Sequence, residues 1–214
     1  MIKLSELLTP ENIRAGLVCS SKKRTFEILG QIFAPQLGDE NKADCNATRQ
    51  NNIADNKEPS SLSPSDQELT QEKEKEKENE TCCIECLLNR EKLGNSALGN
   101  GVAIPKGRLE EGSQPLAAFL QLNQGIDYGS ADGKPVDLIL ALLLPPEFCE
   151  TYVKELPLVA KRLMDKSLCK QLRTAQNAKD LWEILKHNDD AFESEIKQSQ
   201  LEEDVNQENS SQTE

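Results

Sequence analysis

The chain has 214 residues, of which 36% are hydrophobic and 29% are charged, and its formal net charge at pH 7 is -12. The length suits one ordinary domain, and the low hydrophobic fraction predicts that part of the chain stays outside a folded core. The acidic balance excludes the basic footprint of a nucleic-acid-binding protein, and no apolar run approaches the ~20 residues that a membrane span requires.

Acidic side chains concentrate in two stretches of low complexity. Residues 38–81 carry 12 acidic and 6 basic side chains, and residues 188–214 carry 9 acidic and 1 basic, so the remainder is close to neutral. Such stretches bury too little apolar surface to offset the entropy of ordering them. We therefore predict one domain over residues 1–187, interrupted by a low-complexity insert at about 38–81, and an acidic disordered tail over residues 188–214.

The N-terminal segment predicts a strand followed by a helix. Residues 12–19 alternate loosely between apolar and polar, as in a strand. Ser20 or Ser21 is placed to cap a helix whose apolar residues recur at helical spacing up to Pro35. After the insert, residues 82–93 again have helical spacing, and the alternating Glu and Lys residues that precede them could extend this helix.

The second half of the chain contains two further strands and three helices. Residues 116–122 suit a strand, and residues 135–146 are almost wholly apolar after Asp137, as expected of a strand buried on both faces. This order predicts an α/β fold in which helices flank a mixed β-sheet. The helices are predicted at about 147–165, 166–175 and 179–186.

A glycine-rich stretch, residues 94–111, lies between the predicted helix and these strands. Its glycines allow the backbone to take positive φ and to approach other groups closely, and an apolar strand follows at Val102 to Ile104. Pro105 then begins a Pro-Lys-Gly-Arg turn, which ends the strand. A turn held by a rigid strand presents one side chain, here that of Lys106, and functional groups are often placed in this way.

Four segments carry a family resemblance through their order and spacing: residues 90–94, 99–105, 135–145 and 158–163. Together they resemble the type-2 (mannitol/fructose-like) enzyme IIA family of the phosphotransferase system, and above all its nitrogen-regulatory members. The resemblance covers residues 1–37 and about 82–187. It implies the fold of this family, a mixed sheet flanked by helices, and so agrees with the order of the predicted elements.

In this family a His in an Ile-Pro-His-Gly turn accepts a phosphoryl group from a histidine-carrier phosphoprotein. A nearby Arg neutralises the phosphoryl charge, and a second His on a later helix lies beside the acceptor. Residue by residue, the resemblance assigns the Arg to Arg90, the acceptor position to Lys106 and the second His position to Tyr152. Both histidines are therefore replaced in this chain.

Lysine is a poor phosphoryl acceptor. Its reference pKa is about 10.4, so only about one amine in a few thousand is neutral at pH 7, and we expect Lys106 to be solvated on its turn. We therefore predict a regulatory binding module that is no longer phosphorylated at this position. Lys106, Arg90 and Arg108 would bind an anion, with Asn100 and Gly101 in the binding surface; the competing interpretation is a surface lysine without a role.

Two other functions stay open. The protein could be an active phosphocarrier that uses another acceptor, such as His187, the only histidine of the chain. Cys82, Cys83 and Cys86 contain a C-x-x-C and are weak candidates for a redox or zinc switch. No second cysteine pair accompanies them, and small buried side chains on a helix explain the same spacing.

The resemblance implies regulatory target proteins as partners, such as potassium-transport or signalling proteins, together with the histidine-carrier phosphoprotein. The resemblance also implies a bacterial protein. The start of the chain shows no signal peptide and the seven cysteines follow no disulfide pattern, so we expect a cytoplasmic protein with reduced thiols. The sequence contains no nucleotide-binding or metal-carboxylate motif, so we expect no cofactor.

Overall fold

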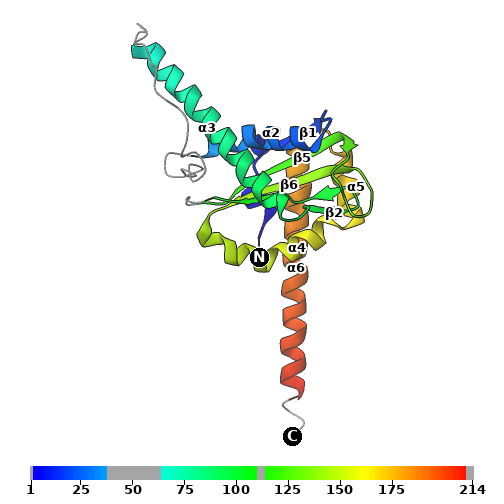
Figure 1. The fold of residues 1–214 in the computed structure, drawn as a ribbon. Helices are drawn as coiled ribbons and strands as arrows, with labels where there is room; N and C mark the ends of the chain where they lie inside the picture. Colours follow the sequence, from blue (N-terminus) through cyan, green and yellow to red (C-terminus); the bar gives the residue numbers. More distant parts are fainter. Residues whose placement is uncertain (1, 38–63, 110–113, 211–214) are drawn as a thin grey trace.

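The computed structural model describes residues 2–37, 64–109 and 114–210. Within these residues, six strands form one sheet in the order β1-β5-β6-β3-β2, and β4 also pairs with β6 (Figure 1). The strands are β1 (Ile13–Leu17), β2 (Ala97–Gly99), β3 (Val102–Ala103), β4 (Lys106–Arg108), β5 (Leu116–Ile126) and β6 (Val136–Leu144).

The sheet is mixed, because parallel and antiparallel pairs alternate across it. β1 is parallel to β5, and β3 and β4 are parallel to β6, whereas β5 is antiparallel to β6 and β2 to β3. β3 and β4 pair in succession with β6, with Val102 opposite Leu138 and Lys106 opposite Leu142. The predicted α/β fold with a mixed sheet is therefore confirmed.

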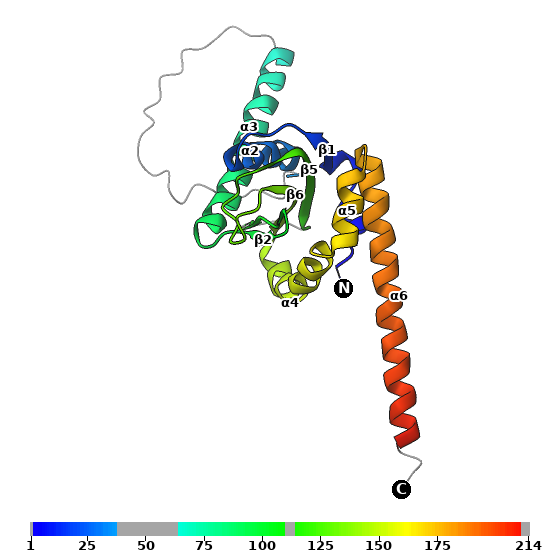
Figure 2. The same cartoon turned by 90° about the vertical axis from the view of Figure 1, so that its right-hand side faces the viewer.

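Helices cover both faces of the sheet (Figure 2). One face packs against α2 and α3, and the other against α1, α4, α5 and α6. Two short 3-10 helices, Pro10–Asn12 and Ala34–Gln36, lie between these elements. The helices are α1 (Leu4–Leu7), α2 (Lys22–Phe33), α3 (Pro64–Lys92), α4 (Pro146–Leu163), α5 (Lys166–Thr174) and α6 (Ala178–Ser210).

The central strand β6 explains why both faces carry helices. Successive side chains of a strand point to opposite faces, and those of β6 divide accordingly between two cores. Leu140 and Leu142 pack with α4 and α6, whereas Ile139 and Ala141 pack with α2 and α3. Because these side chains are fully buried on both faces, the strand reads as an uninterrupted apolar run.

The N-terminus of α2 follows the predicted cap. Ser21 has an extended backbone, and its hydroxyl accepts a hydrogen bond from the Arg24 N–H at 3.2 Å. This bond satisfies one of the N–H groups that a helix leaves without a partner at its first turn. The predicted helix after Ser21 is therefore confirmed, and it runs to Phe33.

Helix α3 begins earlier than the predicted helix at residue 82. It extends from Pro64, so that the alternating Glu and Lys residues lie within it, and its N-terminal part projects beyond the sheet (Figure 1). The low-complexity segment before residue 82 therefore extends this helix, as its Glu and Lys residues allowed, and the bounds of the insert stay a prediction. Residues 38–63, the remainder of the predicted insert, lie outside the described residues.

Helix α6 continues through the start of the predicted disordered tail, because a buried ion pair holds it to α4. Arg162 on α4 and Asp189 on α6 form this ion pair, with side chains 4% and 0% exposed. The Asn188 side-chain oxygen accepts two further hydrogen bonds from Arg162, at 3.0 and 2.8 Å, and the Ser5 N–H donates to Asp189 at 2.8 Å. The prediction that order ends at residue 187 is therefore wrong for the turns that follow.

Among the described residues, no helix is long and apolar enough to cross a membrane.

Candidate anion-binding site

Lys106 is the first residue of β4, so the predicted turn at this position is wrong. Its backbone is paired with Leu142 of β6, and the Leu142 N–H donates to the carbonyl oxygen of Pro105 at 3.0 Å. At the other end of β4, the Leu109 N–H donates to the carbonyl oxygen of Leu144 at 2.9 Å. The pairing along β6 fixes the direction in which the Lys106 side chain leaves the sheet.

The residue after Lys106 allows α3 to lie directly against β4. A Cβ atom on Gly107 would lie 2.7 Å from the Leu143 side chain and 2.9 Å from the backbone of Cys86 on α3, which is closer than real Cβ contacts. Only glycine therefore permits this distance between helix and strand. Arg90 follows Cys86 by one helical turn, and this close packing brings Arg90 and Lys106 to the same cavity.

That cavity, which we call the Lys106 cavity, has a volume of about 310 Å³. Its polar side consists of Lys106, the C-terminal end of α3 and the loop that directly follows α3. Its apolar side consists of residues from β2, from the segment before β4 and from one face of α4. The lining residues are Arg90, Glu91, Gly94, Asn95, Ser96, Leu98, Ile104, Lys106, Val153, Leu156, Pro157 and Ala160.

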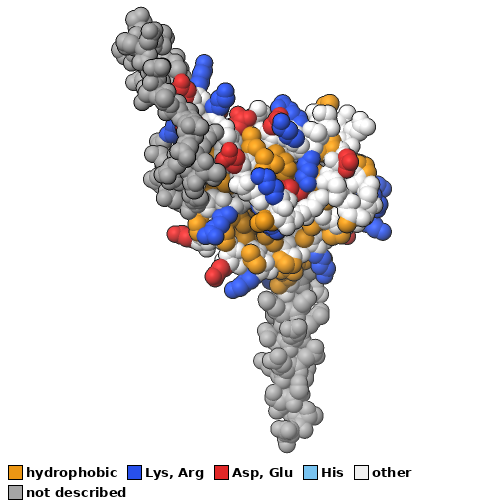
Figure 3. Space-filling model, viewed as in Figure 1, with side chains coloured by type: hydrophobic (Ala, Val, Ile, Leu, Met, Phe, Trp, Pro, Cys, Tyr) orange, Lys and Arg blue, Asp and Glu red, His pale blue; other side chains and the backbone are white. Residues whose placement is uncertain are grey.

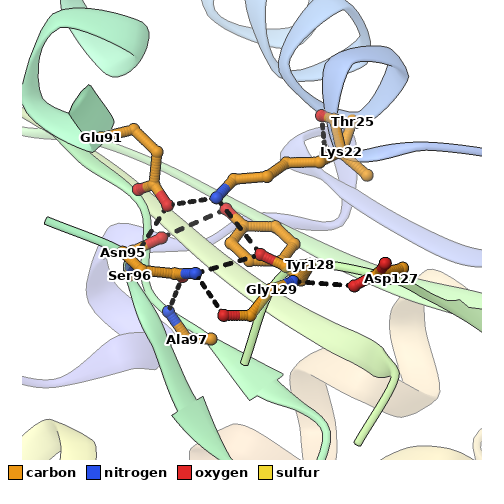
Figure 4. Close-up of polar contacts among 9 residues, drawn as sticks. All are labelled: Lys22, Thr25, Glu91, Asn95, Ser96, Ala97, Asp127, Tyr128 and Gly129. Atoms are coloured by element: carbon orange, nitrogen blue, oxygen red, sulfur yellow. Dashed lines mark hydrogen bonds and ion pairs between the residues drawn. The ribbon is translucent and has the colours of Figure 1, made fainter. Parts of the chain in front are cut away.

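The single carboxylate that lines the cavity is already neutralised. Lys22 Nζ of α2 lies 2.6 Å from Glu91 Oε1, and the Ser96 N–H donates to the same oxygen at 3.0 Å (Figure 4). Within the part of the chain that the structure describes, no carboxylate forms an ion pair with Lys106 or Arg90. The cavity therefore contains two cations whose charge is not balanced locally, which is the arrangement that favours an anion.

Lys106 is half-buried, so the expectation that it is solvated is wrong. Burial lowers the pKa of its amine below the usual value of lysine, because removing a charge from water disfavours the charged form. The neighbouring Arg90 guanidinium lowers this pKa further, and Glu91 raises it in part. A larger fraction of Lys106 is therefore neutral at a given pH than of an exposed lysine.

A network of hydrogen bonds holds the loop on the polar side of the cavity. Lys22 Nζ lies 4.2 Å above the centre of the Tyr128 ring, and the Tyr128 and Ser96 hydroxyls are 3.1 Å apart (Figure 4). The Asn95 amide donates to the carbonyl oxygens of Tyr128 and Gly129 at 3.1 and 2.6 Å. Sequence reasoning did not find Lys22, Tyr128 or the role of Glu91, because these contacts join segments far apart in the chain.

Tyr152 is not among the described residues that line the cavity. It is 6% exposed and packs edge-on against Phe148, with ring centres 6.5 Å apart, in the core beneath α4. Burial, and to a lesser extent Glu155, raises the pKa of its hydroxyl to about 12. The next residue, Val153, lines the cavity instead.

The other predicted binding residues lie apart from Lys106. Arg108 is exposed at the end of β4 and does not line the cavity. Asn100 and Gly101 line a second cavity of about 430 Å³, where Arg173 donates to Asp137 and to the Asn100 carbonyl oxygen. The structure therefore brings Arg90 and Lys106 together and places Arg108, Asn100 and Gly101 elsewhere.

The remaining candidates also lie outside the Lys106 cavity. His187 is exposed on α6. Cys83 is buried, and its burial raises the pKa of its thiol to about 12, with a smaller contribution from Cys86. The reactive thiolate is therefore disfavoured. Cys82 is buried on the same helix, and Cys83 is a free thiol. Among the described residues, no group of three His, Cys, Asp or Glu side chains is arranged to hold a metal ion.

The mixed sheet between two helical layers, with Arg90 and Lys106 at one cavity beside the end of α3, agrees with the resemblance of the sequence to the type-2 enzyme IIA family. The family described as "Phosphoenolpyruvate-dependent sugar phosphotransferase system, EIIA 2" matches residues 67–188, and the chain belongs to this family. The chain is 38% identical over 190 residues to a nitrogen regulatory protein homolog of Haemophilus influenzae, covering 88% of this chain and 93% of the relative.

Solved structures agree with this assignment. The nitrogen regulatory protein IIA-Ntr from Neisseria meningitidis superposes with a TM-score of 0.61 and 30% identity, covering 85% of this chain and 98% of that one. The IIA mannitol protein from Escherichia coli shares the fold at 16% identity, with a TM-score of 0.53, over 83% of this chain and 98% of that one. The resemblance found in the sequence is confirmed at the level of the family and the fold.

Proposed function

We propose that this protein is a cytoplasmic regulatory component of the phosphotransferase system that acts by binding other proteins and is not phosphorylated at position 106. Its relatives from Haemophilus influenzae and Escherichia coli carry the name nitrogen regulatory protein, which supports a regulatory role. The proposed partners are regulatory target proteins, such as potassium-transport or signalling proteins, and the histidine-carrier phosphoprotein.

One observation carries this proposal: the side chain that shares the cavity with Arg90 is an amine and not an imidazole. A neutral imidazole offers a lone pair near pH 7, whereas an ammonium has none. The pKa of Lys106 is lowered by burial and by Arg90. However, an arriving phosphoryl dianion favours the charged ammonium, since an opposite charge nearby raises the pKa of an amine. Lys106 would therefore bind the phosphoryl group without attacking it.

The position of Tyr152 supports the same proposal. Its side chain is buried in the core, and its hydroxyl, with a pKa raised to about 12 by burial, stays protonated at neutral pH. A residue placed in this way offers no second general base or hydrogen-bond acceptor to a phosphoryl group in the cavity. Both positions that carry His in the family thus lack the chemistry of phosphoryl transfer in this chain.

The test is incubation of the protein with the histidine-carrier phosphoprotein, itself labelled with radioactive phosphate. We expect no stable label on the wild-type protein. Lys106→His restores an imidazole at the same backbone position and should gain label, which shows that the carrier recognises the site. Label at residue 106 of the wild-type protein would refute the proposal.

A further inference from the structure

The Lys106 cavity differs from the second cavity in that neither of its lining cations forms an ion pair with a described carboxylate. In the second cavity, Arg173 donates two hydrogen bonds to Asp137, both of 2.7 Å, and Lys134 lies 4.0 Å from Asp132. The buried Arg162 is likewise paired. Among the described cations that line these cavities, Arg90 and Lys106 are the pair that shares one cavity without a carboxylate partner.

The two cations suit a phosphate group in particular. The planar guanidinium of Arg90 can bind two oxygens of a phosphate side by side, and the ammonium of Lys106 can donate to the third. Glu91 does not compete for these donors, because Lys22 and the Ser96 N–H already occupy its carboxylate. A single carboxylate ligand would leave part of this donor set unused, so the charge pattern favours a dianion.

The opposite side of the cavity is apolar. Val153, Leu156 and Ala160 recur at the spacing of one face of α4, and together with Leu98 and Ile104 they form a wall opposite the cations. Val153 is 67% exposed, so a ligand that covers it would remove apolar surface from water. On the face shown in Figure 3, hydrophobic side chains gather around α4 and are bordered by Lys and Arg side chains.

We propose that the Lys106 cavity reversibly binds a small organic phosphate, with the phosphoryl group between Arg90 and Lys106 and a compact apolar carrier against the α4 wall. A volume of about 310 Å³ is at the lower end of the range of ligand pockets, which suits one small ligand. The proposal rests on the proposed function in one respect: position 106 holds the phosphoryl group without forming a bond to it.

The charged groups around Lys106 predict how binding depends on pH. α3 contributes Arg90 and Glu91, α2 contributes Lys22 through Glu91, and the cavity residues of α4 do not ionise. Affinity rises as the phosphate becomes a dianion at about pH 6. It falls again at higher pH, as Lys106 loses its proton at a pKa that burial and Arg90 place below the usual value.

The test is calorimetric titration of the full chain with phenyl phosphate, inorganic phosphate and phenol. We expect phenyl phosphate to bind most tightly, because it alone engages both walls. Arg90→Gln and Lys106→Met should each weaken it about tenfold, the loss expected for one charge-assisted hydrogen bond. Lys134→Gln, which removes a paired lysine outside the cavity, is the matched control and should bind like the wild-type protein.

A second variant tests the contribution of the apolar wall to binding separately from that of the cations. Val153→Ser should weaken phenyl phosphate several-fold and leave inorganic phosphate unchanged, and Val153 is exposed, so the variant should fold. Equal binding of phenyl phosphate and inorganic phosphate, or equal binding by the Arg90→Gln and wild-type proteins, would overturn the proposal.

The source of the phosphate is decided by competition with the histidine-carrier phosphoprotein. One outcome is that the phosphorylated carrier displaces phenyl phosphate while no phosphoryl group becomes covalently attached to this protein. In that case the ligand is a partner's phosphohistidine, and the assignment to a small molecule is overturned. Failure of phenyl phosphate to bind, without label on residue 106, overturns this inference and leaves the proposed function intact. Label on residue 106 overturns the proposed function itself.

Discussion

Replacing Asp189 by alanine should destabilise the whole domain, because it leaves a buried guanidinium without its counter-ion. Arg162 is 4% exposed and keeps the Asn188 side chain, at 3.0 and 2.8 Å, and the Ile2 carbonyl oxygen, at 3.5 Å. Its guanidinium also lies 5.0 Å from the centre of the Phe192 ring, which carries no charge. The Ser5 N–H also loses its acceptor. Removing one partner of a buried ion pair destabilises a protein by about 3–5 kcal/mol, and we expect a loss in this range.

Urea unfolding followed by circular dichroism measures this loss. For a slope of about 2 kcal/mol per molar urea, the midpoint should fall by roughly 2 M. Asp190→Ala is the matched control, since Asp190 is the next residue on α6 and is exposed. A chain truncated after His187 should lose as much stability as Asp189→Ala, whereas one truncated after Lys197 should keep the ion pair.

The reasoning would be refuted if Asp189→Ala and Asp190→Ala shifted the midpoint equally. It would also be refuted if truncation after His187 left the unfolding curve unchanged, because α6 would then contribute nothing to the domain beyond that residue. Either result would support the original expectation from the sequence, in which the acidic tail begins at residue 188 and is independent of the core.

Three further predictions concern the Lys106 cavity. Gly107→Ala should lower the free energy of unfolding by about 1–3 kcal/mol, because the added Cβ would lie 2.9 Å from the backbone of α3. Urea titration measures this loss, and an unchanged midpoint would contradict the close packing of α3 against β4. Lys22→Met should lower the affinity for phenyl phosphate roughly tenfold in calorimetry, because Glu91 would lose its cation and attract Arg90 and Lys106 instead. Equal affinity of the variant and the wild-type protein would contradict this charge balance. Arg90→Gln should raise the pKa of Lys106, measured by NMR titration of the amine, because a neighbouring cation no longer disfavours the ammonium.

The sequence was most informative where local pattern and burial agree. The apolar run after Asp137 predicted a strand buried on both faces, and β6 is that strand, with its side chains divided between the two cores. Ser21 predicted the start of α2 because capping depends only on the neighbouring residues. The order of strands and helices then sufficed for the mixed sheet, although not for the order of its strands.

The sequence was least informative where a structure depends on a distant partner. Lys106 follows a proline and reads as a turn, but its backbone pairs with Leu142, 36 residues later, and so forms a strand. Tyr152 and Val153 are adjacent on α4, and which of them faces the cavity depends on the side of the helix that meets the sheet. The anchoring of α6 depends on Arg162, whose burial the sequence does not reveal.

The resemblance implies a histidine at position 106 in the family, and under our proposal lysine there changes the chemistry of the site more than its charge. Arg90 and Lys106 share a cavity whose shape depends on Gly107 and on the packing of α3 against β4, so the cationic site is built into the fold. An imidazole there could alternate between a free and a phosphorylated state. An amine in this place keeps a positive charge whenever an anion is bound, since the anion itself favours the protonated form. Under our proposal, the site therefore reports the presence of a phosphate by reversible binding and does not pass a phosphoryl group on.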